Sequence, residues 1–169
     1  MSYKSRYDPN PDLQATTAMF RELTPSRYEC ELIGVQHQGV GLHWKAGDYS
    51  VVASSLADPW MRNTGFTAAT QLTGLVGVET DTIPGNQTAA SSCGHGLTVF
   101  FHRELGGDKD GNADATRYTA TSGATVFASG SHQFSWGLDD FKLNPDQGHG
   151  FVSHPLQRFM RNAFNSMTQ

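Results

Sequence analysis

The chain has little cysteine: only Cys30 and Cys93 occur among its 169 residues. Two cysteines are too few for a disulfide scaffold, and although one bridge between them stays open, the sequence favours free thiols in a reducing cytoplasm. His95 follows Cys93 closely, but a thiol and an imidazole that act together usually meet in space rather than as sequence neighbours. We therefore predict a loop or buried thiol at Cys93 rather than a catalytic nucleophile.

The chain also lacks a long apolar run. Residues 1–10 carry charge but no hydrophobic stretch, so no signal peptide is expected. The longest apolar stretches fall far short of the roughly 20 residues that span a bilayer. We expect a soluble, cytoplasmic protein without membrane contact.

Charged residues are scarce and are not clustered. They make up 17% of the chain, the formal net charge is −4, and Lys and Arg are scattered. A nucleic-acid platform needs clustered positive charge, so no nucleic-acid partner is expected. The seven histidines form no His-x-His or His-Glu-x-x-His pair, and no Cys-x-x-Cys accompanies them, so no metal site is predicted.

What the sequence does contain is enough for one domain with a core. Its 37% hydrophobic content suits a single domain of this length, and its 18 glycines indicate many turns. We predict an N-terminal arm at residues 1–27 and a mixed α/β domain at residues 28–169, with a sheet of at least five strands. The expected strands lie at residues 30–37, 40–44, 49–53, 75–80, 97–102, 116–120 and 124–129.

Local signals place these elements further. Residues 45–48 resemble a hairpin loop, residues 116–120 an edge strand, and residues 124–129 the most buried strand. A helical turn is expected at residues 58–61, and a closing helix is expected to begin near Pro155. The predicted core comprises Ile33, Val76, Phe100, Val126 and Phe127, with Leu156, Phe159 and Phe164 on the helix.

The segment that follows the strand at residues 124–129 carries polar and aromatic side chains. In open α/β sheets, loops at the carboxyl ends of strands usually bind ligands. We therefore predict that this loop lines a small-molecule site, with His132, Gln133, Trp136 and Asp139 as binding residues.

Glu79 ends an apolar strand, and Asp81 follows it at the spacing that places two side chains on one side of an extended chain. Partial burial would raise the pKa of such a carboxyl group and suit it to acid–base chemistry. Two neighbouring carboxylates repel each other, which raises the proton affinity of one of them, or they jointly hold a cation. The alternative is that both are solvated residues at the end of a strand.

Several blocks resemble a known family. They are Trp60-x-x-x-Thr64-Gly65-Phe66, the segment Leu72 to Asp81, the segment Tyr118 to Asp139 and the closing helix from Pro155 to Asn162. Over about residues 30–165 the sequence resembles the C-terminal region of the N,N-dimethylformamidase large (beta) subunit family. The block from Ser122 to Asp139 is its most specific part.

This resemblance implies a class I glutamine-amidotransferase-like, flavodoxin-like α/β fold with additional strands. It also implies hydrolysis of a formamide to formate and an amine, with iron held by two tyrosines and a glutamate. These iron ligands lie upstream of the matched region, so no cofactor is predicted within this chain. Gly77-Val78-Glu79 matches the family's Gly-aromatic-Glu, with Val78 in place of the aromatic residue, which makes Glu79 the candidate catalytic residue.

Three functions from different classes follow. The first is an amide (C–N) hydrolase-related domain, a C-terminal fragment or subunit that is inactive alone, with Glu79 as catalytic residue and Asp81 in the binding site. The second is a non-catalytic module that binds a small molecule or carbohydrate on Trp44, Trp60 and Trp136. The third is a structural or oligomerisation domain. Apolar strands with one strong helix, and an arm carrying Met19, Phe20 and Leu23, predict a homo-oligomer or a partner subunit.

Overall fold

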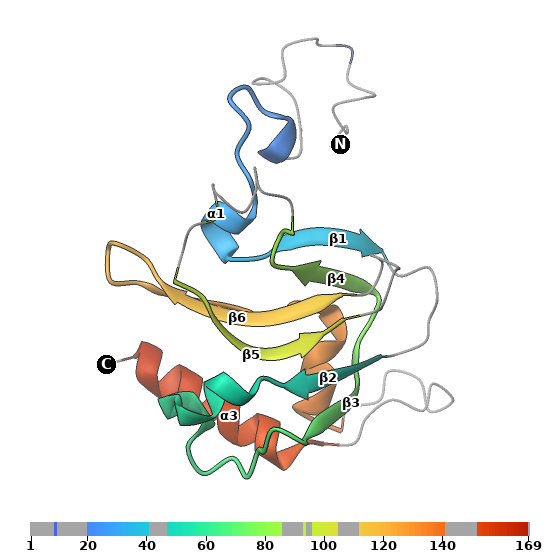
Figure 1. Cartoon of the computed structure of the whole chain (residues 1–169), viewed down its shortest axis with the longest axis vertical. Helices are drawn as coiled ribbons and strands as arrows, with labels where there is room; N and C mark the ends of the chain where they lie inside the picture. The colour runs from blue at the N-terminus through green and yellow to red at the C-terminus, as the bar shows by residue number, and fades with distance from the viewer. Residues whose placement is uncertain are drawn as a thin grey trace.

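The chain folds around two antiparallel sheets and a C-terminal helix, as the computed structural model in Figure 1 shows. The structure describes residues 9, 20–40, 47–85, 93, 96–104, 112–140 and 152–168. The larger sheet has the strand order β3 (Gln71–Val76), β2 (Gly47–Val51), β5 (Thr98–Arg103), β6 (Ala113–Thr119) and β7 (Thr125–Ala128). The smaller sheet pairs β1 (Gln36–Val40) with β4 (Glu79–Thr82).

These strands confirm the mixed α/β class and the sheet of at least five strands. The flavodoxin-like arrangement is not confirmed, because every strand pair in the described residues is antiparallel. The places predicted for two strands within the sheet were wrong. β6 lies inside the sheet between β5 and β7, whereas β7 is an edge strand whose residues are only half-buried.

The remaining elements are short, apart from one helix. They are α1 (Cys30–Ile33) and the 3-10 helices η2 (Phe20–Glu22), η3 (Ala53–Ala57), η4 (Pro59–Met61) and η5 (His132–Gly137). The helical turn predicted at residues 58–61 is confirmed as η4, where the Asp58 side chain accepts a hydrogen bond from the Trp60 backbone N–H. Of the hairpin loop predicted at residues 45–48, residues 45–46 lie outside the described residues and residues 47–48 belong to β2.

The strand predicted at residues 30–37 was wrong over its first half. Cys30–Ile33 forms α1, and Gly34, with a φ of 82°, ends the helix in the left-handed conformation that favours glycine. β1 then begins at Gln36. The alternating apolar pattern therefore marked a helical turn followed by a strand.

The two cysteines are bonded to each other, so the interpretation as free thiols was also wrong. Both are buried, and the bond ties α1 to a residue 63 positions further along the chain. Sequence separation gives no information on whether two thiols meet in the fold. The bond also excludes Cys93 from acting as a free nucleophile.

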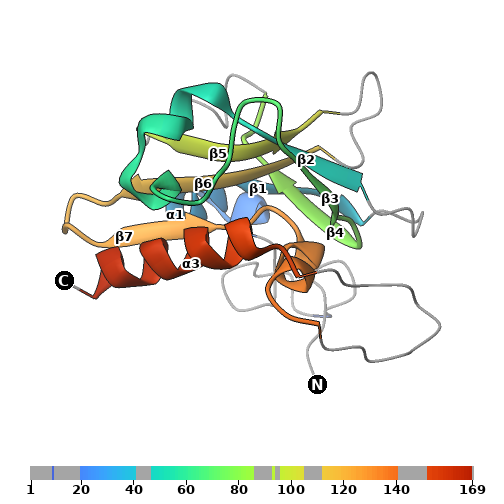
Figure 2. The same ribbon diagram turned by 90° about the horizontal axis from the view of Figure 1, so that it is seen from below.

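Helix α3 (His154–Met167) packs along one side of the larger sheet, beside β7 (Figure 2). The Ser153 side chain accepts a hydrogen bond from the Leu156 N–H and caps the helix. Leu156, Phe159 and Ala163 are fully buried, as expected for residues spaced by three and four along one face. The prediction for Phe164 was wrong: it is 60% exposed, since it lies about 140° around the helix from Phe159.

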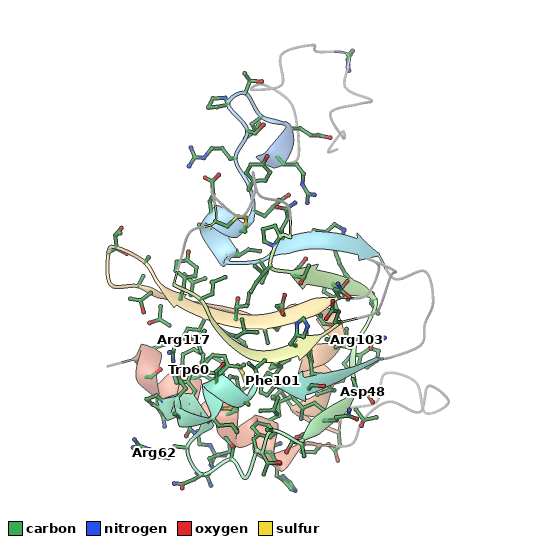
Figure 3. All side chains as sticks on the ribbon, in the orientation of Figure 1. Asp48, Trp60, Arg62, Phe101, Arg103 and Arg117 are labelled. Carbon is green, nitrogen blue, oxygen red and sulfur yellow. A yellow bond between two sulfur atoms is a disulfide. The ribbon has the colours of Figure 1, made fainter. Side chains whose placement is uncertain are left out.

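Aromatic rings fill the space between α3 and the sheet. Phe159 lies 4.9 Å from Phe100 and 5.0 Å from Phe101 between ring centroids, and Trp60 stacks on Phe100 at 5.3 Å. Figure 3 shows Arg117 beside Trp60, where its guanidinium lies 4.7 Å from the ring centroid. The predicted core residues Val76 and Phe100 are fully buried, whereas Ile33, Val126 and Phe127 are half-buried.

Candidate functional site

Pairing of β1 with β4 brings a histidine to the predicted carboxylates. His37 lies directly opposite Asp81 in the register, and Val40 lies opposite Glu79, with an irregularity between His37 and Gly39. Because successive side chains of a strand alternate, Glu79 and Asp81 reach the same side of β4, as the sequence predicts. His37 is the shared contact of the two carboxylates.

The two carboxylates and two imidazoles form a cluster, here called the Glu79 cluster: His37, Glu79, Asp81 and His132. The His37 Nδ1 lies 3.3 Å from Glu79 Oε1 and 3.5 Å from Asp81 Oδ1. The His132 Nε2 lies 3.3 Å from Glu79 Oε2. Each oxygen of Glu79 therefore faces a different imidazole, and 41% of the Glu79 side chain is exposed. The cluster is accessible to a solute.

A second set of contacts fixes the loop that carries His132. The Ser131 Oγ accepts a hydrogen bond from the Gly77 N–H at 2.9 Å and donates one to the Gly77 carbonyl at 3.1 Å. The Asp81 N–H donates to the Gly130 carbonyl at 2.9 Å. Because both ends of the Glu79 segment are bonded to residues 130–131, His132 is held beside Glu79.

Val78, directly before Glu79, has a φ of 64°. This left-handed conformation is a genuine outlier for a β-branched residue and costs free energy that the surrounding contacts must offset. It also interrupts the chain between β3 and β4, so that Glu79 starts a new strand in the other sheet, and the single strand predicted at residues 75–80 was wrong. Strained backbone of this kind clusters at functional sites.

The other predicted binding residues differ in their positions. Gln133 is buried, and its amide lies so close to Gly77 that a Cβ built there would be 2.5 Å from Gln133 Oε1. This oxygen is buried without a hydrogen-bond partner. Trp136 is half-buried against the core, and Asp139 is exposed two residues after η5. The structure thus brings together Glu79, Asp81 and His132 from the predicted set.

Sequence analysis missed His37 as a member of the site. It stood only among the seven histidines, because its pairing partner lies 44 residues away along the chain. The available signal was its place in an alternating segment, which becomes informative once the β1–β4 register is known.

The pKa of Asp81 is raised, chiefly by burial. The neighbouring Glu79 carboxylate raises it as well, and the His37 and His132 imidazoles lower it in part. A carboxyl group with a raised pKa in the folded state contributes stability below its unfolded pKa and loses that contribution as the pH rises through the folded value.

Asp81→Asn is therefore expected to gain stability relative to the wild type as the pH rises from about 3 to about 7. The free energy of unfolding, measured by urea titration at a series of pH values, tests this, with Asp140→Asn at an exposed position as the matched control. If the variant instead loses relative stability as the pH rises, the imidazole contacts outweigh burial.

The residues that the structure describes support neither a metal site nor an aromatic binding surface at Trp60. No group of three or more His, Cys, Asp or Glu residues in the described part of the chain is arranged to hold a metal ion. Trp60 is 2% exposed and belongs to the core, so the predicted aromatic binding surface was wrong at this residue. Trp44 and His95 lie outside the described residues.

Over the described ranges, no helix has the length and apolar character that a membrane crossing needs.

A family model described as N,N-dimethylformamidase beta subunit-like, C-terminal, matches residues 1–149. A search of curated proteins found no match.

Proposed function

The chain belongs to the N,N-dimethylformamidase beta subunit-like, C-terminal family, and from this membership we propose that it is an amide (C–N) hydrolase-related domain. Glu79 is its proton-transfer residue, and the substrates are linear amides. The single observation that supports this assignment best is the placement of each Glu79 oxygen 3.3 Å from a separate imidazole.

In this proposal the Glu79 carboxylate takes a proton from the water that attacks the amide carbonyl carbon. A C–O bond forms, the C–N bond breaks, and the leaving nitrogen takes up a proton, which gives a carboxylic acid and an amine. His132 is 66% exposed and contacts Glu79, so it is placed to pass a proton between Glu79 and the leaving group. His37, bonded to the neighbouring strand, positions Glu79 and Asp81.

The iron that the family resemblance implies does not fit the described residues. Its expected ligands are two tyrosines and a glutamate, yet the Tyr49 hydroxyl donates to the Ser129 carbonyl and the Tyr118 hydroxyl to the Leu32 carbonyl. Only Tyr28 remains among the described tyrosines. We therefore propose that any iron site is supplied from outside these residues, and no step above depends on it.

This reasoning also supports a partner. The Glu79 cluster accounts for proton transfer, and we propose that activation of the carbonyl comes from a partner subunit or from further polypeptide. Among the described residues, the exposed large apolar side chains are Leu32 on α1 and Phe164 and Met167 on α3. Single exposed side chains of this kind are normal on a protein surface, so the support for a partner subunit comes from the beta subunit-like family. The proposed location is the cytoplasm.

The test is amide hydrolysis by the chain alone and together with the polypeptides encoded beside it, followed as formate released from N,N-dimethylformamide. Glu79→Gln is expected to lower the rate of the active assembly by about 100- to 10,000-fold, because the amide cannot accept the proton. The exposed Glu22→Gln is the matched control and should keep the wild-type rate. Equal rates for the two variants would contradict the proposal.

A further inference from the structure

A second polar cluster lies away from the Glu79 cluster and lines an open cavity of about 490 Å³. One part of the lining is apolar, from Val52, Ile83 and Val99, and the other part is polar. The polar residues are Thr82, His102, Glu104, Asn112 and Asp114. Among the residues that the structure describes, the lining thus contains two carboxylates and no Lys or Arg, which favours a ligand that carries positive charge.

Asp114 lines this cavity, and its carboxylate already contacts three protein groups. Its carboxylate accepts hydrogen bonds from the Ile83 N–H at 2.8 Å and from the Thr82 hydroxyl, and it contacts the His102 Nδ1 at 2.6 Å. Only 6% of its side chain is exposed. An acceptor-only carboxylate at Nδ1 places the proton of a neutral imidazole on Nδ1 and leaves the His102 Nε2 as a hydrogen-bond acceptor. Asp114 is therefore a positioning residue for His102.

A second hydrogen-bond acceptor, the Glu104 carboxylate, lies beside the His102 Nε2. The His102 Nε2 lies 4.0 Å from Glu104 Oε2, and the two side chains are 42% and 75% exposed. Two acceptors at this separation can each receive one N–H of the same ammonium nitrogen, at ordinary hydrogen-bond lengths of about 2.9 Å. Alkyl groups on that nitrogen would then contact Val52, Ile83 and Val99.

We propose that this cavity binds small protonated primary or secondary alkylamines, through Glu104 and the His102 Nε2. The proposal is independent of the function proposed for Glu79. For so small a ligand at an open site we expect a Kd of the order of millimolar.

Binding is measured by proton NMR on the intact chain, from the shift of the His102 imidazole resonances. The three probes have the same number of non-hydrogen atoms. Diethylammonium carries a positive charge and two N–H groups, tetramethylammonium carries a positive charge without an N–H group, and diethyl ether has neither. Diethylammonium should bind most tightly. Equal binding of tetramethylammonium, or no shift with diethylammonium, would overturn the proposal.

Two variants separate this site from non-specific attraction. Glu104→Gln, at a largely exposed position, should weaken diethylammonium binding by about two- to fivefold, whereas Glu22→Gln should not change it. Unchanged binding in Glu104→Gln would contradict the proposal.

His102→Phe tests the imidazole acceptor itself. This variant keeps a ring but removes the Nε2 acceptor, so it should weaken diethylammonium binding by about two- to fivefold. Because the variant has no imidazole, binding is followed from the methyl resonances of Val52, Ile83 and Val99, which line the same cavity. Unchanged binding in His102→Phe would contradict the role of His102.

Discussion

Phe159→Ala is expected to lower the free energy of unfolding by about 3–5 kcal/mol. The Phe159 ring is fully buried at the centre of the aromatic core, with ring centroids of Phe100, Phe101, Trp60 and Phe127 all within 5.9 Å. Truncation removes buried apolar surface and leaves a cavity that the rigid sheet and the stacked Trp60 cannot fill by relaxing. Urea-induced unfolding, monitored by tryptophan fluorescence, measures the change.

Phe164→Ala provides the matched control on the same helix. Its side chain is 60% exposed, so the same truncation should change stability by less than about 0.5 kcal/mol. Similar losses in both variants would contradict the packing of α3. A loss below about 1 kcal/mol for Phe159→Ala would contradict it as well.

Reduction of the Cys30–Cys93 disulfide is expected to cost about 4 kcal/mol of stability. The bond closes a loop between residues separated by 63 positions, and in the chain-entropy model a loop of this length gives that magnitude. The bond also holds α1 beside Cys93, close to the start of the β1 strand that carries His37. Unfolding measured with and without a reductant gives the difference directly.

The control is the double variant Cys30→Ala and Cys93→Ala, whose stability should match that of the reduced wild type and should not respond to reductant. Alkylation of the unreduced, denatured protein, followed by mass spectrometry, checks the bond itself. Modification of both thiols would contradict it. Disulfides are uncommon in a reducing cytosol, so this bond argues against the proposed cytoplasmic location.

Sequence patterns predicted the elements whose signals are local. The helix near Pro155 and the turn at Pro59 depend on capping and on proline, which act within a few residues. The α/β class and several strands follow from short apolar runs. The prediction placed β6 at the edge of the sheet and β7 in its interior, which is the reverse of the structure. Burial of a strand depends on its neighbours in the sheet and not on its own composition.

The candidate site was partly predictable for the same reason. Glu79 and Asp81 are two residues apart, so their shared side of the strand follows from local geometry. His37, by contrast, depends on the β1–β4 register, and the pair His102–Asp114 depends on the β5–β6 register. No pattern in a single sequence specifies such a register across distant strands. The Cys30–Cys93 bond was missed because it is equally non-local.

The central claim is that Glu79 transfers protons during amide hydrolysis, and the kcat of the Glu79→Gln variant tests it most directly. Formate release from N,N-dimethylformamide is followed for the wild-type assembly, for Glu79→Gln and for the exposed control Glu22→Gln. Glu79→Gln should lower kcat by about 100- to 10,000-fold, because its amide cannot accept a proton, and should change KM little. A Glu79→Gln variant that retains the wild-type kcat would contradict the account.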